Sequence, residues 1–511
     1  MTATMSQTPP VRTTVGLALD GVLAGAVAVG SATLFAGLMG WLGLSGGTPS
    51  PVVAVGGAFV DRTPPWLKEA AISSFGTNDK LALFVGMAVV VIALCAGIGA
   101  VARTRHTAAL VGLSLVGALG AAAVLSRPGA APFDVMPTVL GTVGGVWVLG
   151  RLRQSVDPDS GELTRRRAIA AGGAVLAGFL GSRLGADGSG ASEARAQVTI
   201  PPAAEPSVAI DGASVGVPGI TPYIVPNENF YRIDTALVVP RLDTATWSLR
   251  VWGDVEREVT LDWKTLLSKP LQEALVTLTC VSNEVGGDLI GNARWTGWPI
   301  RELLAMAGPK AGADMVLSRS SDGFTAGTPL TALTDERNAL IAVAMNGQPL
   351  PFEHGFPARL VVPGLYGYVS ATKWVTELKV TRFAADEGYW TPRGWSAMGP
   401  VKTSSRIDVP RRGTRLSAGT VAVAGVAWAQ HRGIATVEVQ VDDGPWQQAR
   451  LAGEPTVDSW RQWVYEWPAT SGAHTLRVRA TDATGAVQVS QLAPPAPDGA
   501  TGLHTVSVTV G

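Results

Sequence analysis

The chain has 511 residues, and this length indicates about three domains rather than one. Its 40 Lys and Arg balance its 40 Asp and Glu, and no basic block stands out, which argues against nucleic acid as a partner. Ala, Gly, Val and Leu dominate up to about residue 185, whereas Trp, Asp, Arg and Pro are common after it. The first part therefore has the composition of a membrane region and the second that of a globular protein.

Five apolar stretches in the first part approach the length that crosses a bilayer, about 17 to 25 residues. Together they predict a transmembrane region over 1–185, and we place them near 15–44, 81–102, 108–126, 134–150 and 168–185. Small residues dominate these stretches, which favours close helix packing in lipid. Asp20 falls within the first stretch, so we expect it to lie near an interface, to be protonated, or to be paired inside the bundle.

The short loops predict an orientation in the membrane. Arginines precede the first stretch, separate the second from the third and separate the fourth from the fifth: Arg12, Arg103, Arg105, Arg151, Arg153, Arg165, Arg166 and Arg167. Because arginine-rich loops stay in the cytoplasm, we expect the N-terminus inside and everything after about residue 186 outside. The sequence thus predicts a multi-pass cell-membrane protein with an extracytoplasmic globular part.

Two short patterns bear on export. Thr164-Arg-Arg-Arg-Ala-Ile-Ala170, followed by an Ala, Gly and Leu stretch, looks like an internal twin-arginine signal, but the arginines alternatively only anchor the last helix. Ala194-Arg-Ala196 resembles a signal cleavage site, although cleavage would detach the globular part. Residues 186–225 are rich in Gly, Ser, Ala and Pro and are expected to form a linker.

The globular part divides into two predicted domains. Over 226–404, strand-like runs (247–252, 359–363, 374–380) mix with short helical patterns (261–267, 300–307) without βαβ regularity, which predicts an α+β domain. Over 405–511, β-branched or alternating runs and a hairpin signal at Asp443-Gly444 predict an immunoglobulin-like β-sandwich; the runs are 421–428, 435–441, 475–480 and 504–510. Five tryptophans are expected in the core and rim of this sandwich: Trp428, Trp446, Trp460, Trp463 and Trp467.

Cys280 is the candidate for chemistry. It closes the apolar run 275–279 and opens a segment rich in Gly, Asn and Asp, so we expect it at a strand end. The other cysteine, Cys95, lies in a predicted membrane stretch, which argues against a disulfide between the two. A lone thiol is a buried small hydrophobe, a nucleophile or a metal ligand. A cysteine hydrolase needs a nearby histidine; His354 is a candidate, but nothing in the sequence places it there.

Three ordered blocks carry a resemblance to a known family. They are Asn229-Phe-Tyr-Arg-Ile-Asp234, then Thr277-Leu-Thr-Cys-Val-Ser-Asn283 with Gly291-Asn-Ala-Arg-Trp295, and then Met345-Asn-Gly-Gln-Pro-Leu-Pro351 continuing through His354-Gly-Phe-Pro-Ala-Arg359 to Ser370-Ala-Thr-Lys-Trp374. With the trailing sandwich, residues 226–511 resemble the sulfite oxidase family of molybdopterin-dependent oxidoreductases. The chain looks like a membrane-anchored bacterial member with a dimerisation-type C-terminal domain.

The resemblance implies roles for individual residues. Cys280 matches the thiolate that ligates molybdenum, and Arg232 matches a cation at the catalytic site as well as at the pterin. Residues that match contacts to molybdopterin are Glu228, Tyr231, Arg232, Asn283, Arg294, Ser320 or Asp322, His354, Arg359, Ser370 and Lys373. Ser370 and Lys373 match the segment that holds the terminal phosphate of the pterin, and a cation suits a phosphate.

Two positions depart from the family members that oxidise sulfite. Those members carry an arginine where this chain has Val285 and a tyrosine where it has Val343. The resemblance therefore implies two-electron oxygen-atom transfer at molybdenum on a small S- or N-oxide or related substrate, with oxidation of the oxyanion sulfite as an alternative. A non-catalytic cofactor-binding membrane protein is a further alternative, against which the intact set of pterin contacts argues.

The chain offers no electron relay of its own. It has no Cys-x-x-Cys-His, its 2 cysteines are too few for an iron–sulfur cluster, and only His106 of its 5 histidines lies in the membrane half. We therefore expect a separate electron-transfer partner, either a cytochrome or a quinone-linked membrane protein. The C-terminal domain of the family forms dimers, so the resemblance also implies a homodimer.

Overall fold

The computed structural model describes residues 13–45, 47–64, 67, 74, 79–102, 104–153, 161–187 and 190–511. The chain forms two compact units, one of Met1–Ala194 with Ala236–Arg241 and one of Arg195–Thr235 with Leu242–Gly511. Arg12 and Arg103, which enter the orientation argument, lie outside the described residues.

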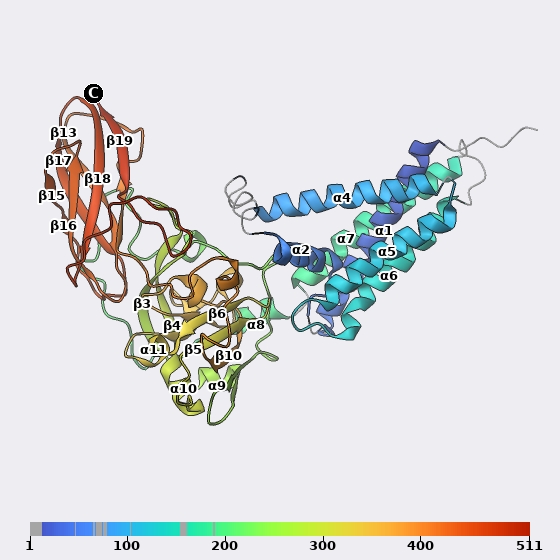
Figure 1. The fold of residues 1–511 in the computed structure, drawn as a ribbon, viewed down its shortest axis with the longest axis horizontal. Coiled ribbons are helices and arrows are strands. Elements are labelled where there is room, and N and C mark those ends of the chain that lie inside the picture. Colours follow the sequence, from blue (N-terminus) through green and yellow to red (C-terminus); the bar gives the residue numbers. More distant parts are fainter. Residues whose placement is uncertain are drawn as a thin grey trace, which may run out of the picture. The chain divides into compact units, whose positions relative to one another are not determined.

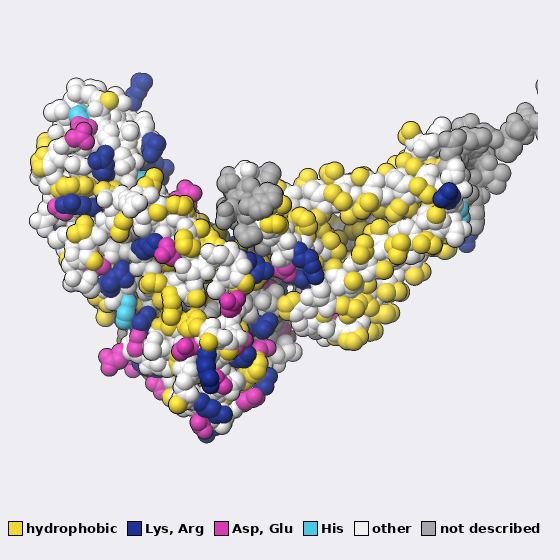
Figure 2. All heavy atoms as spheres, viewed as in Figure 1, with side chains coloured by type: hydrophobic (Ala, Val, Ile, Leu, Met, Phe, Trp, Pro, Cys, Tyr) yellow, Lys and Arg dark blue, Asp and Glu magenta, His cyan; other side chains and the backbone are white. Residues whose placement is uncertain are grey.

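The described chain up to residue 197 is helical (Figure 1), with α1 (Thr14–Trp41), α2 (Pro51–Arg62), α4 (Asp79–Val101), α5 (His106–Leu125), α6 (Met136–Arg153), α7 (Gly161–Asp187) and α8 (Ala191–Gln197). Five helices of the described part are long and apolar enough to cross a membrane, over Thr14–Trp41, Lys80–Val101, His106–Leu125, Pro132–Leu152 and Leu163–Gly185. They coincide with the five predicted stretches. The visible surface of this unit is correspondingly apolar and carries few charges (Figure 2).

Helix α1 is the central helix of the first unit. Of its apolar window 39% is buried, compared with 6% for α4. A Cβ added to Gly30 would overlap the backbone of Ala174, and one added to Gly37 would overlap that of Gly181, both on α7. Glycine is therefore required where the backbones of α1 and α7 touch, as is typical of helices that associate in lipid.

Asp20 is paired inside the bundle, which was one of the three expectations. Its Oδ1 lies 2.8 Å from Nε of Arg167, and its side chain is almost fully buried. Nη2 of Arg167 also donates to the carbonyl oxygen of Gly16 at 2.8 Å. One arginine of the triple-arginine segment thus joins α7 to α1, whereas the neighbouring Arg165 is exposed.

Replacing Asp20 by asparagine should destabilise the helical unit by about 3 kcal/mol, because Arg167 keeps its charge and loses its carboxylate. Thermal unfolding of the detergent-purified protein, followed by circular dichroism at 222 nm, measures this loss. Adding Arg167→Gln to the variant should recover part of it, while Arg165→Gln serves as the control on an exposed arginine. Equal stability of Asp20→Asn and the wild type would contradict the prediction.

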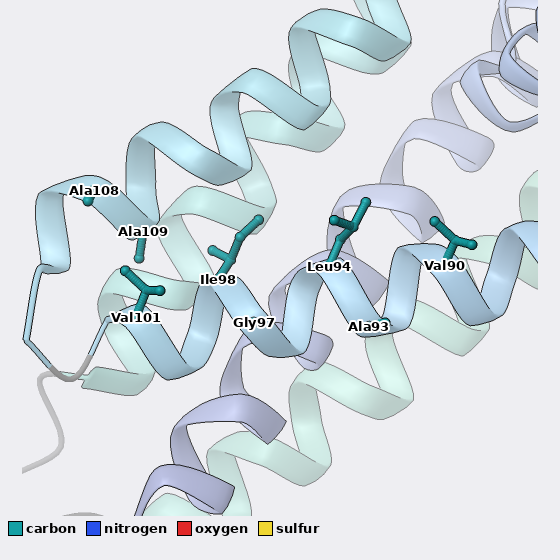
Figure 3. A pocket seen from close by; sticks show the side chains of 8 residues that line it. All are labelled: Val90, Ala93, Leu94, Gly97, Ile98, Val101, Ala108 and Ala109. Carbon is teal, nitrogen blue, oxygen red and sulfur yellow. The ribbon is translucent and has the colours of Figure 1, made fainter.

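A shallow apolar groove of about 540 Å³ lies between α4 and α5 (Figure 3). Its lining residues are Val90, Ala93, Leu94, Gly97, Ile98, Val101, Ala108 and Ala109. Val90 and Leu94 are more than half exposed at 58% and 51%, as expected for side chains that face acyl chains. The groove has the apolar lining expected of a helix surface that faces lipid and indicates no specific ligand.

The second unit begins with two sheets and three helices. One sheet has the order β2 (Val259–Asp262), β1 (Ser248–Gly253), β10 (Val375–Thr381), β5 (Met315–Ser320), β6 (Thr325–Pro329), with only β1 and β10 parallel. The other has the order β3 (Gln272–Thr279), β4 (Ile290–Pro299), β7 (Leu340–Met345), β8 (Gln348–Pro349), with β9 (Arg359–Val361) on β7. The helices are α9 (Trp263–Leu267), α10 (Ile300–Ala307) and α11 (Leu330–Thr334).

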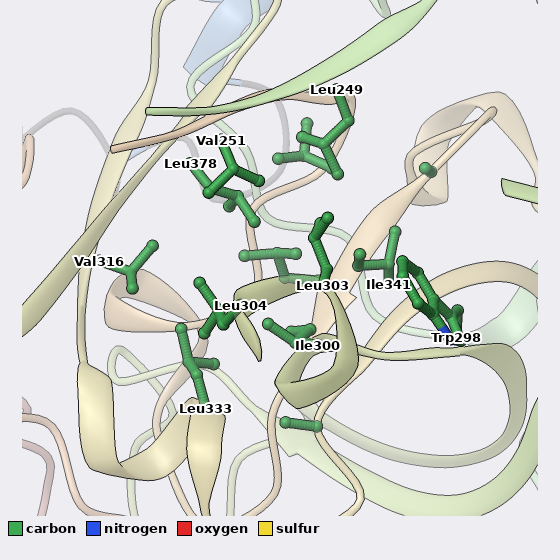
Figure 4. Packing of buried hydrophobic residues seen from close by; sticks show 14 of the residues in the cluster. Leu249, Val251, Trp298, Ile300, Leu303, Leu304, Val316, Leu333, Ile341 and Leu378 are labelled. Atoms are coloured by element: carbon green, nitrogen blue, oxygen red, sulfur yellow. The ribbon is translucent and has the colours of Figure 1, made fainter. Parts of the chain in front are cut away.

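Side chains from both sheets and from α10 form one buried cluster (Figure 4). Helix α10 has the predicted bounds, buries Ile300, Leu303 and Leu304 on one face, and ends at Gly308 in a left-handed conformation. The helix predicted over 261–267 begins two residues late. Leu261 belongs to β2, because the carboxylate of Asp262 accepts the N–H of Thr265 at 2.7 Å and caps α9 there.

Two further sheets form the C-terminal region. Their orders are β11 (Ser404–Val409), β13 (Gly419–Trp428), β17 (Arg461–Ala469), β16 (Arg450–Leu451), and β12 (Arg415–Leu416), β19 (Thr505–Val510), β18 (Gly472–Asp482), β14 (Ile434–Val441), β15 (Trp446–Gln448). One buried cluster draws side chains from both sheets, including Trp463, Trp467 and Val478. The predicted hairpin at Asp443-Gly444 joins β14 to β15.

Trp428 and Trp460 lie elsewhere than predicted. They pack with Trp295 and Tyr366 in a cluster that joins the β3–β4–β7 sheet to the C-terminal region, not in the core between the two C-terminal sheets. The indole N–H of Trp460 donates to the carbonyl oxygen of Tyr223 at 3.0 Å. A β-strand presents side chains to two faces. Trp428, at the end of β13, lies on the face that packs against the β3–β4–β7 sheet and not on the face that packs against the other C-terminal sheet.

From Arg195 onward, the segment predicted as a linker, 186–225, is part of the second unit and is hydrogen-bonded to it. Ala204 N–H donates to Leu271 O at 2.8 Å, and Val215 N–H donates to Gln462 Oε1 at 3.0 Å. Arg195, within the sequence that resembles a cleavage site, lies in α8 and donates to the carbonyl oxygens of Leu350 and Pro349. The domain boundaries at 185, 225 and 404 stay predictions.

Candidate active site

Cys280 directly follows the last residue of β3, as predicted. Its N–H donates to Leu289 O at 2.9 Å, and its carbonyl oxygen accepts the N–H of Asn283 at 3.0 Å. The side-chain oxygen of Asn283 in turn accepts the N–H of Leu289 at 2.8 Å, so it closes the loop over 280–289. The loop fixes the thiol in place, and only 8% of Cys280 is exposed.

Burial raises the pKa of the Cys280 thiol, and hydrogen bonds from the N–H and hydroxyl of Ser282 lower it in part. A thiol in this environment is protonated unless a cation binds to it. A metal ion displaces the proton, since the ligand is the thiolate.

Arg359, at the start of β9, is a buried cation with an unusual set of partners. Its guanidinium donates to the carbonyl oxygens of His354 at 3.2 Å and Ala371 at 3.4 Å, and it lies 5.0 Å above the Trp295 ring. Among the described residues no carboxylate forms an ion pair with it. Burial lowers the pKa of Arg359 to about 10. A desolvated cation held only by carbonyl groups favours an anionic ligand.

His354 lies beside Arg359 and is also buried. Its Nε2 is 3.0 Å from Asn227 O, and its ring meets Phe230 edge to face. Burial, followed by the charge of Arg359, lowers the pKa of His354 to about 4. The imidazole is therefore neutral at pH 7, and its Nε2–H donates to the carbonyl group.

A second pair of cations shares Asp234. Lys373 Nζ lies 2.8 Å from Asp234 Oδ2 and 2.9 Å from Glu353 O, and Arg232 Nε lies 2.9 Å from the same Asp234 oxygen. Burial lowers the pKa of Lys373 to about 8, although Asp234 opposes this shift. Asp234 therefore bridges the two cations.

Tyr231 connects the cations with Cys280. Burial, then the negative charge of Cys280, raise the pKa of Tyr231 far above its usual range, while Arg359 opposes this. Its ring stacks on Phe230 at 5.2 Å. The structure therefore gathers six of the sequence-predicted residues, Cys280, Tyr231, Arg232, His354, Arg359 and Lys373.

The remaining predicted residues have partners within the protein. Ser370 donates to Tyr366 O at 2.9 Å, and Arg294 lies 3.4 Å from Glu273. Asp322 accepts the Thr235 hydroxyl at 3.3 Å, next to Asp234, and the Ser320 hydroxyl accepts the N–H of Asp322. Asn283 closes its own loop, and Glu228 is exposed.

Val343 does not lie where the substrate argument needs it. It is fully buried in the cluster between the two sheets, with Ile341. Its neighbour in β7, Ala342, points to the opposite face, into the cluster that contains Tyr366 and Phe230. Because successive side chains of a strand point to opposite faces, Val343 contributes to the packing of the core. Val285 is half-buried in the Cys280 loop.

Sequence reasoning missed two residues of this site. Asp234 is the last residue of the first family-like block, so its negative charge could have been noticed as a partner for the neighbouring cations. Asn227 acts through its backbone carbonyl group, which carries no signal in the local sequence.

A family model, the oxidoreductase molybdopterin binding domain, matches residues 236–390. The uncharacterized oxidoreductase YuiH of Bacillus subtilis is 32% identical over 188 residues, which cover 36% of this chain and 91% of YuiH. The chain belongs to the sulfite oxidase family of molybdopterin-dependent oxidoreductases. It is an enzyme of the oxidoreductase class.

Mitochondrial sulfite oxidase of Homo sapiens is 31% identical over 325 residues, which cover 53% of this chain and 58% of the human protein. The chain thus spans little more than half the length of that relative. A crystal structure of the sulfane dehydrogenase SoxCD from Paracoccus pantotrophus matches with 24% identity and a TM-score of 0.49, over 56% of this chain and 81% of that one.

The sulfite oxidase family binds a molybdopterin cofactor, and the residues present here fit one. A buried thiol is available for the metal, and Arg359 offers a buried positive charge with no carboxylate of the described residues on it. The hydroxyl oxygen of Ser321 is buried and has no hydrogen-bond partner among the described residues. The backbone N–H of Ser321 donates to Trp374 O at 2.9 Å, so Ser321 lies next to Lys373 in space. An anionic group bound there would give the Ser321 hydroxyl its missing hydrogen-bond partner.

Stability of the cofactor-free protein should fall as the pH drops from about 6.5 to about 4. The folded-state pKa of His354 is about 4, below the unfolded value of about 6.5, so the unfolded chain binds the proton first. The loss from this group is on the order of 3 kcal/mol. Unfolding curves of protein made in a host without molybdopterin, compared with His354→Gln, measure it. A profile equally steep in the variant would assign the loss to other groups.

Proposed function

We propose that this family member is a membrane-anchored molybdenum oxidoreductase that transfers an oxygen atom in a two-electron reaction at an extracytoplasmic site. The observation that carries the proposal is a buried Cys280 thiol and a buried Arg359 that has no carboxylate partner among the described residues, both close enough to Tyr231 to influence its pKa. Five apolar helices support the membrane anchor, and the arginine-rich loops support the orientation.

We assign the metal to Cys280 and the pterin to the cation cluster. Arg359, His354, Tyr231 and Arg232 would bind and orient the pterin, and Lys373 with Ser370 would bind its terminal phosphate. The remaining contacts carried over from the family, including Asn283, act by shaping the loops. When bound, the cofactor supplies the two-electron exchange of an oxygen atom with substrate. The chain itself excludes water from Cys280 and keeps His354 neutral.

The substrate we propose is a small S- or N-oxide. The family arginine is absent at Val285, so the Cys280 loop presents an aliphatic side chain where sulfite oxidases present a cation to the oxyanion. An uncharged oxide needs no such cation. Sulfite oxidation by the same site is the second candidate, because the chain is 31% identical to a human sulfite oxidase over the matched region.

The proposal includes partners and the C-terminal fold. Electrons are exchanged with a separate cytochrome or quinone-linked membrane protein, since the sequence contains no haem or iron–sulfur motif. The two C-terminal sheets form an immunoglobulin-like sandwich, and the family precedent makes it a dimer contact.

A substrate panel tests the proposal. Detergent-purified protein from a host that makes molybdopterin is assayed with reduced viologen against S- and N-oxides, and with ferricyanide against sulfite. Oxidation of the viologen by at least one oxide, at a rate well above that with sulfite, is the expected result. Rapid sulfite oxidation without oxide reduction would favour the second candidate, and stoichiometric cofactor without either activity would refute both.

A further inference from the structure

Tyr366 lies near the end of β3, which leads into Cys280, in a segment to which the family resemblance assigns no role. The next residue, Gly367, lies against the end of β3, because an added Cβ there would be 3.8 Å from the carbonyl oxygen of Thr279. Tyr366 is 5% exposed and packs in the same buried cluster as Val281. Tyr366 therefore packs against the part of the fold that carries the thiol.

The C-terminal region fixes the ring of Tyr366. Gly499 has a φ of 103°, and a Cβ added to it would lie 2.5 Å from the hydroxyl oxygen of Tyr366 and 2.8 Å from the ring carbons Cε2 and Cζ. Lys402 Nζ donates to Asp498 at 2.8 Å and to Gly499 O at 2.7 Å, which holds this segment in place. Only glycine fits between the segment and the ring.

The hydroxyl group of Tyr366 can donate a hydrogen bond. The backbone N–H of Lys402 approaches its oxygen at 3.4 Å, so the oxygen is the acceptor there and its own proton is directed elsewhere. Burial, with smaller contributions from Asp498 and Cys280, raises the pKa of Tyr366 to about 12. The group is thus an uncharged donor at neutral pH.

We propose that Tyr366 donates a hydrogen bond to the oxygen atom of the substrate beside Cys280 and that Gly499 is the residue that positions its ring. This inference rests on the proposed function and deepens it. A neutral donor recognises the oxygen of a sulfoxide or N-oxide without requiring a negative charge. It also supplies a phenol from a segment other than β7, where Val343 replaces the tyrosine of sulfite-oxidising members and faces the core.

Tyr366→Phe tests the donor directly, in the full-length holoenzyme. For the best oxide of the panel we expect kcat/KM to fall about tenfold, and binding of the unreactive analogue dimethyl sulfone, by calorimetry, to weaken about fivefold. Molybdenum content should not change. The matched control is Tyr368→Phe, whose hydroxyl donates to Ser396 O at 2.6 Å and not to substrate. Values for Tyr366→Phe within twofold of wild type, or a loss of molybdenum, would overturn the proposal.

Gly499→Ala tests the positioning. We expect kcat/KM and the affinity for dimethyl sulfone to fall, as in Tyr366→Phe. The double variant Tyr366→Phe/Gly499→Ala should show little further loss of either. Gly485→Ala controls for backbone strain, since Gly485 has a φ of 87° and open space around it. If both alanine variants behave alike, Gly499 does not position the ring. A loaded wild type that reduces no oxide would refute the proposed function, whereas an active wild type with an unaffected Tyr366→Phe would refute only this inference.

Discussion

Replacing Cys280 by serine should lower the rate of oxide reduction at least about a thousandfold. Serine keeps the size of the side chain, but its hydroxyl is not a soft anionic ligand, so the metal loses its one protein ligand. Dye-coupled turnover is measured beside molybdenum and pterin content, because the cation cluster does not depend on the thiol. We therefore expect the variant to retain part of its pterin while it loses activity.

The other thiol provides the control for Cys280. Cys95 is buried among the helices of the first unit, in contact with Gly25 of α1, and Cys95→Ser should leave turnover within about twofold. Substantial oxide reduction by Cys280→Ser, with normal kinetics, would show that the metal does not need this ligand and would overturn the site assignment.

Replacing Arg359 by methionine should change two measurements in opposite directions. Cofactor content should fall about tenfold or more, because a charge-assisted hydrogen bond to an anion contributes about 1.5 to 3 kcal/mol. The cofactor-free protein should become more stable, since methionine removes a buried charge that no carboxylate of the described residues neutralises. Metal analysis, pterin fluorescence and thermal unfolding of both forms test this pair.

Arg250→Met is the matched control for Arg359→Met. Arg250 is paired with Glu258 at 2.8 Å and its side chain is 47% exposed, so its loss should leave cofactor content unchanged. A stoichiometric cofactor in Arg359→Met, or a similar loss in both variants, would contradict the role of Arg359. Increased stability without the cofactor distinguishes a functional charge from a structural one, because a structural arginine would stabilise the folded protein.

The sequence was most informative where local chemistry decides the outcome. Hydropathy alone located the five apolar helices, because a span of that length has few alternatives in a globular chain. The position of Cys280 after β3 followed from the change of composition at that point, and the ends of α10 followed from its apolar face and Gly308. The ordered family-like blocks then indicated the cofactor, and the comparisons with known proteins agree with them.

Tertiary structure decided which of these residues meet. Two sequence neighbours of the same type, Tyr366 and Tyr368, differ because one packs beside the Cys280 loop and the other donates to a backbone carbonyl group. Val343 is a second example. Its position in β7 decides that the side chain faces the core and not the candidate site, and the local sequence does not show this.

The sequence by itself determined the class of chemistry, through the thiol, the cations and their order along the chain. Only the tertiary structure decided which cations lack a carboxylate, since ion pairs such as Lys373–Asp234 and Arg167–Asp20 join residues 139 and 147 positions apart. The physical reason is that burial and pairing depend on distances in space, and these are set by the packing of sheets and helices that local sequence does not encode.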